Sequence, residues 1–322
     1  MRAFPIVAAT LMLAACRQSE PPPEPEPAPV DAAPAARSEP EPMRAAEAPA
    51  SGERDRLAEI LDAQPEQVQQ RYDERHPHAT LEFFGIEPGM TVVETLPGGG
   101  WYTRILLPYL GADGGLVAAN YAQAMFANFG FADEQFMVRL ARWPEEFPTR
   151  TAGWCQGDCA PVETFWLGSL PARLEGSADA MLFVRALHNL ARFETEDGGS
   201  YLDEALADAY AVLAPGGILG IVQHEARADM PDDWADGSNG YLQKQFVIDR
   251  VRQAGFEFVA ESDINANPDD APTTDESVWR LPPSLSVPED AEDPEARRDR
   301  YRAIGESNRM TLKFRKPEGP AG

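Results

Sequence analysis

The sequence predicts an α/β doubly wound fold in a single domain, in which helices cover both faces of a mostly parallel sheet. Two observations lead to this prediction. Short apolar segments alternate with amphipathic segments from residue 91 to residue 261, and strands that alternate with helices form parallel sheets. Residues 180–184, Ala-Met-Leu-Phe-Val, include no polar side chain, which is typical of a strand buried on both faces.

The composition fits a globular domain and excludes one class of partner. Of the 322 residues 43% are hydrophobic, which is enough for a substantial core. The net charge is −25 and no dense run of Lys and Arg occurs, whereas nucleic-acid binders carry a basic surface. We therefore expect no nucleic-acid partner, and the acidity favours solubility. The oligomeric state stays open.

The first sixteen residues have the build of an export signal. Arg2 provides a positive start, residues 4–13 form a short apolar core, and Leu-Ala-Ala precedes Cys16. Leu-Ala-Ala-Cys resembles the bacterial lipobox, which implies cleavage before Cys16 and attachment of lipid to it. The alternative is an ordinary signal peptide cut near the same place. We expect a protein lipid-anchored on the periplasmic side of a bacterial membrane, and the non-acidic Arg17 favours the outer membrane.

A tether and then the folded domain follow this signal. Residues 17–50 are rich in Pro, Glu and Ala and cannot bury enough apolar surface to offset chain entropy, so they predict an extended tether. The domain is expected over residues 51–317. It begins with helices, because Leu57, Ile60 and Leu61 share one helical face, and further helical segments run to residues 75 and 84.

A glycine-rich turn follows the first predicted strand, residues 91–94. The turn is Pro-Gly-Gly-Gly at residues 97–100, and a helix over residues 101–110 comes after it. Glycine lets the backbone turn sharply and approach a ligand, toward which the free N–H groups of the helix point. The pattern suggests a nucleotide-like ligand, and an unliganded turn is the alternative.

The other predicted elements complete the alternation. Strands are expected at residues 116–120, 162–167, 180–184, 218–222, 256–261 and 310–314, and helices at residues 133–142, 199–213 and 240–254. An insertion, residues 262–309, separates the last two strands and contains a helix that Asp293 caps and Pro294 starts. The last strand alternates apolar and polar residues, so we expect it beside the sixth at the edge of the sheet.

Several of these motifs together resemble a known family. The strand ending in Glu94, the glycine turn, and Leu-Ala-Pro-Gly-Gly at residues 213–217 resemble the class I S-adenosylmethionine-dependent methyltransferases. The resemblance implies a Rossmann-like, seven-stranded sheet with an antiparallel last strand, and S-adenosylmethionine as cofactor. Further segments resemble a group of exported bacterial proteins labelled predicted methyltransferases: residues 75–77, 83–86, 97–103, 188–189, 265–268 and 279–283.

The resemblance also implies a cofactor site. Glu94 stands where the family places the acid that holds the amino-acid end of the cofactor. Asn120 stands where a carboxylate usually binds the ribose hydroxyls, and an amide would lose the charge-assisted bond. Ser169 stands where an aspartate often meets the adenine. The cofactor-binding residues implied are Glu94, Pro97, Gly98, Gly99, Gly100, Trp101, Tyr102, Asn120, Ser169 and Arg185.

Histidines and cysteines supply the remaining candidates. His188 and His224 follow the fourth and fifth predicted strands, so either could be a catalytic base or could merely cap a strand end. The other two histidines, at residues 76 and 78, match no zinc spacing, and we expect no metal. Cys155 and Cys159 would form a disulfide in an oxidising compartment and could bind metal in a reducing one.

Two functions follow from these features. The first is an exported, lipid-anchored S-adenosylmethionine-dependent methyltransferase of unknown substrate, with a small molecule as ligand. The second is a non-catalytic envelope protein that binds a ligand and retains the fold without the cofactor.

Overall fold

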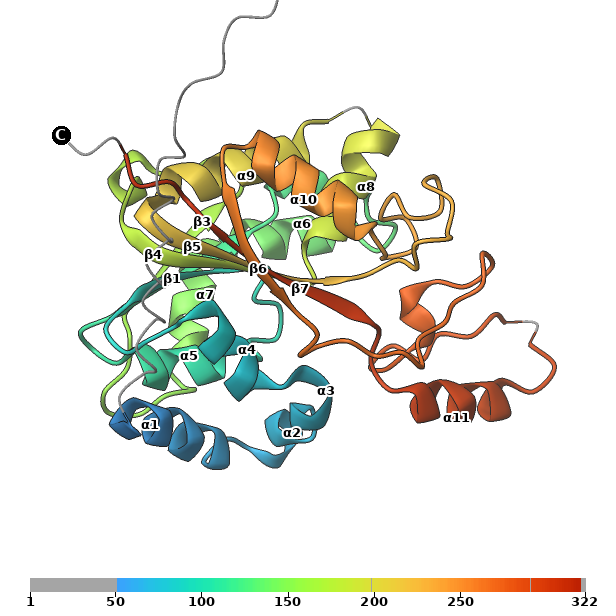
Figure 1. Cartoon of the computed structure of the whole chain (residues 1–322), viewed down its shortest axis with the longest axis horizontal. Helices are drawn as coiled ribbons and strands as arrows, with labels where there is room; N and C mark the ends of the chain where they lie inside the picture. Colours follow the sequence, from blue (N-terminus) through green and yellow to red (C-terminus); the bar gives the residue numbers. More distant parts are fainter. Residues whose placement is uncertain (1–50, 198, 290, 320–322) are drawn as a thin grey trace, which may run out of the picture. The chain divides into compact units, whose positions relative to one another are not determined.

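The computed structural model describes residues 51–197, 199–289 and 291–319 and is built on one seven-stranded sheet (Figure 1). The strand order is β3-β2-β1-β4-β5-β7-β6. Strands β1 to β5 are parallel, and β7 runs antiparallel to both β5 and β6. The predicted fold class is therefore confirmed. The strands are β1 (Thr91–Thr95), β2 (Gly115–Asn120), β3 (Val162–Trp166), β4 (Ala178–Val184), β5 (Leu213–His224), β6 (Glu257–Ser262) and β7 (Arg309–Arg315).

Helices cover both faces of this sheet (Figure 1). One face carries α1 (Ser51–Asp62), α4 (Pro77–Phe84) and α5 (Thr103–Leu110), and the short helices α2 (Glu66–Gln69) and α3 (Tyr72–Arg75) connect the first two. The other face carries α6 (Glu134–Ala141), α8 (Leu187–Asp197), α9 (Tyr201–Val212) and α10 (Lys244–Gln253). The remaining elements are α7 (Trp143–Thr151), α11 (Pro294–Ile304) and the 3-10 turns η1 (Gln123–Asn128), η2 (Ala172–Leu174) and η3 (Val278–Arg280).

The core lies on both faces of the central strands, as the sequence of β4 predicts. Ala180 and Leu182 pack with α4 and α5, while Met181 and Phe183 pack with α8 and α9. Each of these four side chains is at most 1% exposed. Because successive strand residues point to opposite faces, only a strand covered on both sides uses apolar residues at every position.

The last strand is placed differently from the prediction. β7 does lie beside β6, but it is inserted between β5 and β6, so that β6 forms the edge. β7 is also buried along most of its length, and even Thr311, between Met310 and Leu312, is fully buried. β6 shows the half-exposed alternation that an edge strand tolerates.

Two helices were not expected from the sequence. α7 contains Pro144 in its first turn and Pro148 inside, and proline in a helix interior normally argues against a helix. α8 begins immediately after β4, because Arg185 adopts a left-handed conformation (φ 56°) that turns the chain within two residues. The expected helix over residues 133–142 is α6, and Asp293 caps α11 as predicted, since Oδ1 accepts from the Ala296 N–H at 3.0 Å.

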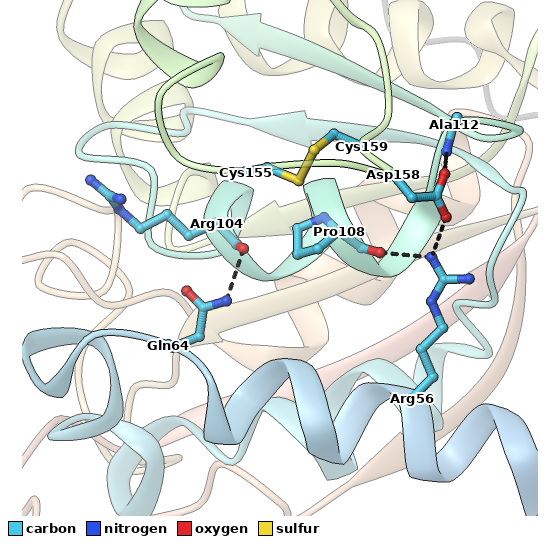
Figure 2. Close-up of a disulfide and its surroundings, with 8 residues drawn as sticks. All are labelled: Arg56, Gln64, Arg104, Pro108, Ala112, Cys155, Asp158 and Cys159. Atoms are coloured by element: carbon cyan, nitrogen blue, oxygen red, sulfur yellow. Dashed lines mark hydrogen bonds and ion pairs between the residues drawn. A yellow bond between two sulfur atoms is a disulfide. The ribbon is translucent and has the colours of Figure 1, made fainter.

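The cysteine pair forms the predicted disulfide (Figure 2). Its five-residue loop joins two helices through Asp158, whose carboxylate accepts from the Ala112 N–H at 2.7 Å and from Arg56 at 3.2 Å. Arg56, on α1, also donates to the Pro108 carbonyl of α5 at 2.8 Å. The loop thereby holds α1 against the end of α5.

Some sequence predictions fall outside this description. The export signal, the lipid attachment at Cys16 and the tether all lie within residues 1–50, beyond the described ranges. From residue 51 onward, none of the helices described has the length and apolarity needed to cross a bilayer. In the same residues no group of three His, Cys, Asp or Glu side chains gathers that could hold a metal ion.

Candidate functional site

A cleft of about 450 Å³ opens at the carboxyl ends of β1, β4 and β5. This is the edge at which open α/β sheets bind their ligands. Four parts of the chain line it: Arg75 at the end of α3, the glycine turn after β1, the segments that follow β4 and β5, and parts of the insertion between β6 and β7. The insertion contributes an apolar wall made of Val278, Trp279, Leu281, Pro282 and Pro283.

The glycine turn reaches the cleft with its backbone. Gly98 (φ 55°) and Gly99 both line the cleft, and a Cβ added at Gly99 would meet no atom within 4 Å. Gly100 (φ 79°) faces the opposite way, because a Cβ there would lie 2.0 Å from the Trp154 ring. Leu96 precedes the turn with φ 48°, a left-handed conformation that costs a non-glycine residue free energy.

Glu94 is buried beneath the turn and does not line the cleft. Its side chain is 4% exposed, and its carboxylate accepts from the Thr103 hydroxyl at 2.6 Å. Thr103 is the first residue of α5, so Glu94 anchors the start of that helix. Burial raises the pKa of the Glu94 carboxyl to about 7, although the bonds from Thr103 lower it in part.

The two histidines lie side by side in the cleft, with ring centroids 5.4 Å apart. His188 Nδ1 contacts the Gln223 side-chain oxygen at 3.4 Å. The Gln223 amide nitrogen donates to the Gly240 carbonyl at 3.0 Å, which directs its oxygen toward His188. Because an amide oxygen only accepts, the tautomer that satisfies this contact carries its proton on His188 Nδ1 and leaves the Nε2 lone pair to accept.

Both histidines are neutral at neutral pH. Burial lowers the pKa of His188 to about 4, and burial together with His188 and nearby arginines lowers the pKa of His224 well below its usual range. His224 Nδ1 is hydrogen-bonded to the Ser307 hydroxyl at 2.5 Å. A neutral imidazole with one free nitrogen can accept a proton from a bound molecule, and this is the chemistry that the pair offers.

Arginines form the charged wall of the cleft. Arg75 and Arg185 line it directly, and both face the buried carboxylate of Glu306. The Arg75 guanidinium also lies over the Trp101 ring, 4.7 Å from its centroid. Trp101 is fixed in turn, because its Nε1 donates to the Val68 carbonyl at 3.1 Å.

The structure brings together some of the candidate site residues and separates others. Those that line the cleft are Pro97, Gly98, Gly99, Trp101, Arg185, His188 and His224. Those that do not are Glu94, Gly100, Tyr102, Asn120 and Ser169. Tyr102 is buried behind the cleft, near Arg75 and Arg309.

Local contacts explain the position of Asn120 and Ser169. The Asn120 side-chain oxygen accepts from the N–H of Tyr121 at 2.9 Å. Tyr121, 1% exposed, crosses the end of β1 and donates its hydroxyl to the Ala186 carbonyl at 2.7 Å. Its ring therefore fills the space between the ends of β2 and β4. Ser169 is exposed, and its N–H donates to the Trp166 carbonyl at 2.9 Å, while the Gly168 N–H donates to Asp208 at 2.6 Å.

Several cleft residues were not identified as functional from the sequence. Arg75 and Trp279 fall within segments that carry the family resemblance, but no role followed from their spacing. Glu306 and Ser307 carried no signal, because they belong to the chain between α11 and β7 and reach the cleft only through the folding of the insertion.

The similarity of this chain to known proteins is limited to solved structures. No family model and no curated protein matches the chain by sequence. Among solved structures, the [4+2]-cyclase SpnF is similar at 20% identity over 78% of this chain and 83% of its own, with a TM-score of 0.47. An S-adenosylmethionine-dependent methyltransferase from Aquifex aeolicus is similar at 18% identity over 65% of this chain and 93% of its own, with a TM-score of 0.42.

A third similar structure is the geranyl diphosphate C-methyltransferase from Streptomyces coelicolor, at 12% identity over 80% of this chain and 87% of its own, with a TM-score of 0.43. Identities and TM-scores this low do not bear on the function of the chain. The fold assignment rests on the strand order and strand directions of the chain itself.

Proposed function

We propose that the protein is an exported, lipid-anchored methyltransferase that uses S-adenosylmethionine and acts on a small molecule. One observation carries the proposal. The cleft joins the glycine turn, where a ligand can approach the backbone, to His188, whose Nε2 is free to accept a proton. A methyl acceptor whose nucleophilic atom carries a hydrogen loses that proton as it reacts, and a neutral imidazole at this place can take it.

The residues present fit one end of the cofactor. Gly98 and Gly99 line the cleft and let the backbone approach its amino-acid end. When bound, S-adenosylmethionine supplies an electrophilic methyl group. The chain's own contribution is to hold the acceptor against His188, with Trp279 and Pro282 keeping water from one side of the cleft.

Calorimetric titration with S-adenosylmethionine and S-adenosylhomocysteine tests this function. We expect saturable binding to the wild type and weaker binding to Gly99→Ala, because the added methyl group projects into open space at the turn. Gly130→Ala is the matched control, since a Cβ there also meets nothing within 4 Å and Gly130 does not line the cleft. If millimolar cofactor produces no heat of binding and no thermal shift, the methyltransferase function is excluded.

A second function is supported by a different observation. Tyr121 fills the space between the ends of β2 and β4, and the side chains of Asn120 and Ser169 do not line the cleft. This arrangement favours a non-catalytic envelope protein that binds a ligand in the cleft without S-adenosylmethionine. Ligand binding that persists when no cofactor binding is measurable would support this alternative.

The lipid anchor is a separate part of the proposal and rests on the sequence around Cys16. We expect Cys16→Ala protein, expressed with its signal, to leave the membrane fraction and to lose the lipid-dependent mass increase at its N-terminus. Variant protein that still sediments with membranes would show that another segment holds it there.

A further inference from the structure

The cleft holds more positive charge than its own carboxylates balance. Four guanidinium groups surround the buried carboxylate of Glu306. A second carboxylate, that of Glu74, accepts a hydrogen bond from the Glu306 backbone N–H at 2.9 Å. These groups are Arg71, Arg75, Arg185 and Arg309, with Glu306 and Glu74. Of these, Arg75, Arg185 and Glu306 line the cleft, so the lining has an excess of one positive charge in a chain of net charge −25.

Arg185 is the guanidinium with the weakest partner. Arg75 and Arg309 lie 2.8 and 2.9 Å from the oxygens of Glu306, whereas Arg185 lies 3.7 Å away. Among the side chains that the structure describes, no other carboxylate pairs with Arg185. Burial and the neighbouring Arg75 lower the pKa of Arg185 to about 10. Its side chain is 29% exposed, and that exposed part lines the cleft.

The cofactor of the proposed function does not supply the missing charge. S-adenosylmethionine carries a sulfonium, an ammonium and a single carboxylate, so it brings net positive charge. The two cleft histidines are neutral and add none. A second ligand beside the cofactor would therefore have to be anionic to offset the excess, and charge-assisted bonds to arginine are the strong ones.

We propose that the small-molecule ligand of this cleft is an organic anion, whose carboxylate or phosphate binds between Arg185 and Arg75 and whose apolar body lies against Trp279 and Pro282. Its role as methyl acceptor rests on the proposed methyltransferase function, but the anion site itself does not. In that role the nucleophile of the acceptor lies near His188, which shares the cleft with both arginines.

Three probe molecules test the site on the full-length protein without S-adenosylmethionine. Benzoate carries a carboxylate and phenyl phosphate carries a phosphate, each on a phenyl ring. Benzamide is the neutral counterpart of benzoate. We expect calorimetry and thermal shift to detect at least one of the anions and not benzamide, and the preferred anion identifies the headgroup. Benzamide binding as tightly as the anions, or no binding of either anion, would overturn the proposal.

Substitutions localise the binding to Arg185. Arg185→Asn removes the charge and suits the left-handed backbone, which asparagine tolerates. We expect it to weaken anion binding by about tenfold to a hundredfold. The matched control is Arg173→Asn, which loses an exposed ion pair with Glu163 and leaves binding unchanged. Circular dichroism checks that both variants are folded. We expect Arg185→Lys, which keeps the charge, to retain the preference for the anions over benzamide.

The outcomes separate this inference from the proposed function. Anion binding that depends on Arg185, in a protein that binds no S-adenosylmethionine, would support the site and refute the methyltransferase. Cofactor binding together with anion affinities that Arg185→Asn does not change would leave the methyltransferase standing and refute the site.

Discussion

Ionisation of Glu94 is expected to weaken the folded state as the pH rises. The carboxyl is buried under the glycine turn, and its pKa is raised from the ordinary 4.5 to about 7 because burial disfavours the charged form. In the unfolded chain the group ionises at the lower value. Between pH 4.5 and 7 the folded protein therefore holds a proton that the unfolded chain has released, and the free energy of unfolding falls as the pH increases.

The magnitude follows from the difference between the two pKa values. A rise from 4.5 to about 7 corresponds to a loss on the order of 3 kcal/mol once the pH is above 7. Glu94→Gln removes the titration and keeps an oxygen that can accept from the Thr103 hydroxyl. Relative to the wild type, we expect this variant to gain on the order of 3 kcal/mol between pH 5 and pH 8.

Urea unfolding at pH 5, 6, 7 and 8 measures this difference. His188 acts in the opposite direction, because its lowered pKa makes stability rise with pH from about 4 to 6.5. That contribution is present in both proteins and cancels in the comparison. Glu87→Gln, a change at an exposed side chain before β1, is the control. A difference between Glu94→Gln and wild type that stays constant across the pH range would refute the reasoning.

Three further predictions concern stability. Replacing both Cys155 and Cys159 by serine opens the disulfide loop, of sequence separation 4, and should lower the free energy of unfolding in urea by about 2 kcal/mol relative to the oxidised wild type. In the wild type the buried Arg280 lies 2.6 Å from the Asp270 carboxylate. Asp270→Ala removes this counter-charge and should lower the free energy of unfolding by about 3–5 kcal/mol, measured as a lower urea midpoint. Asp293→Ala removes the cap of α11 and should cost about 1 kcal/mol, with faster amide exchange in its first turn.

The sheet could be predicted because its signals are local. The unbroken apolar run of β4 predicts burial on both faces, and the Gly-rich segment after β1 predicts a turn at the ligand-binding edge. These signals depend only on the period of the backbone and on the conformations that glycine allows. Local rules did not predict the helix α7, because it contains Pro148 and proline normally interrupts a helix. Its packing beside β3 stabilises it nevertheless.

The candidate site could be predicted only in part. His188 and His224 were found because carboxyl ends of parallel strands meet at one edge. Glu94 was assigned to the same edge, but strand alternation directs it into the helix layer, where it bonds Thr103. A residue next to the glycine turn can face the cleft or the core, depending on the backbone conformation at the end of the strand. The spacing of residues in the sequence does not determine that conformation.

The sequence by itself determined the order of the seven strands, the glycine turn, the cysteine pair and the expectation of export. Only the tertiary structure decided that β7 lies between β5 and β6, that Tyr121 closes the space beside Asn120, and that arginines from three distant segments share one carboxylate. Contacts of this kind join residues such as Arg75 and Glu306, 231 positions apart. No local pattern encodes them, because each depends on the packing of the whole chain.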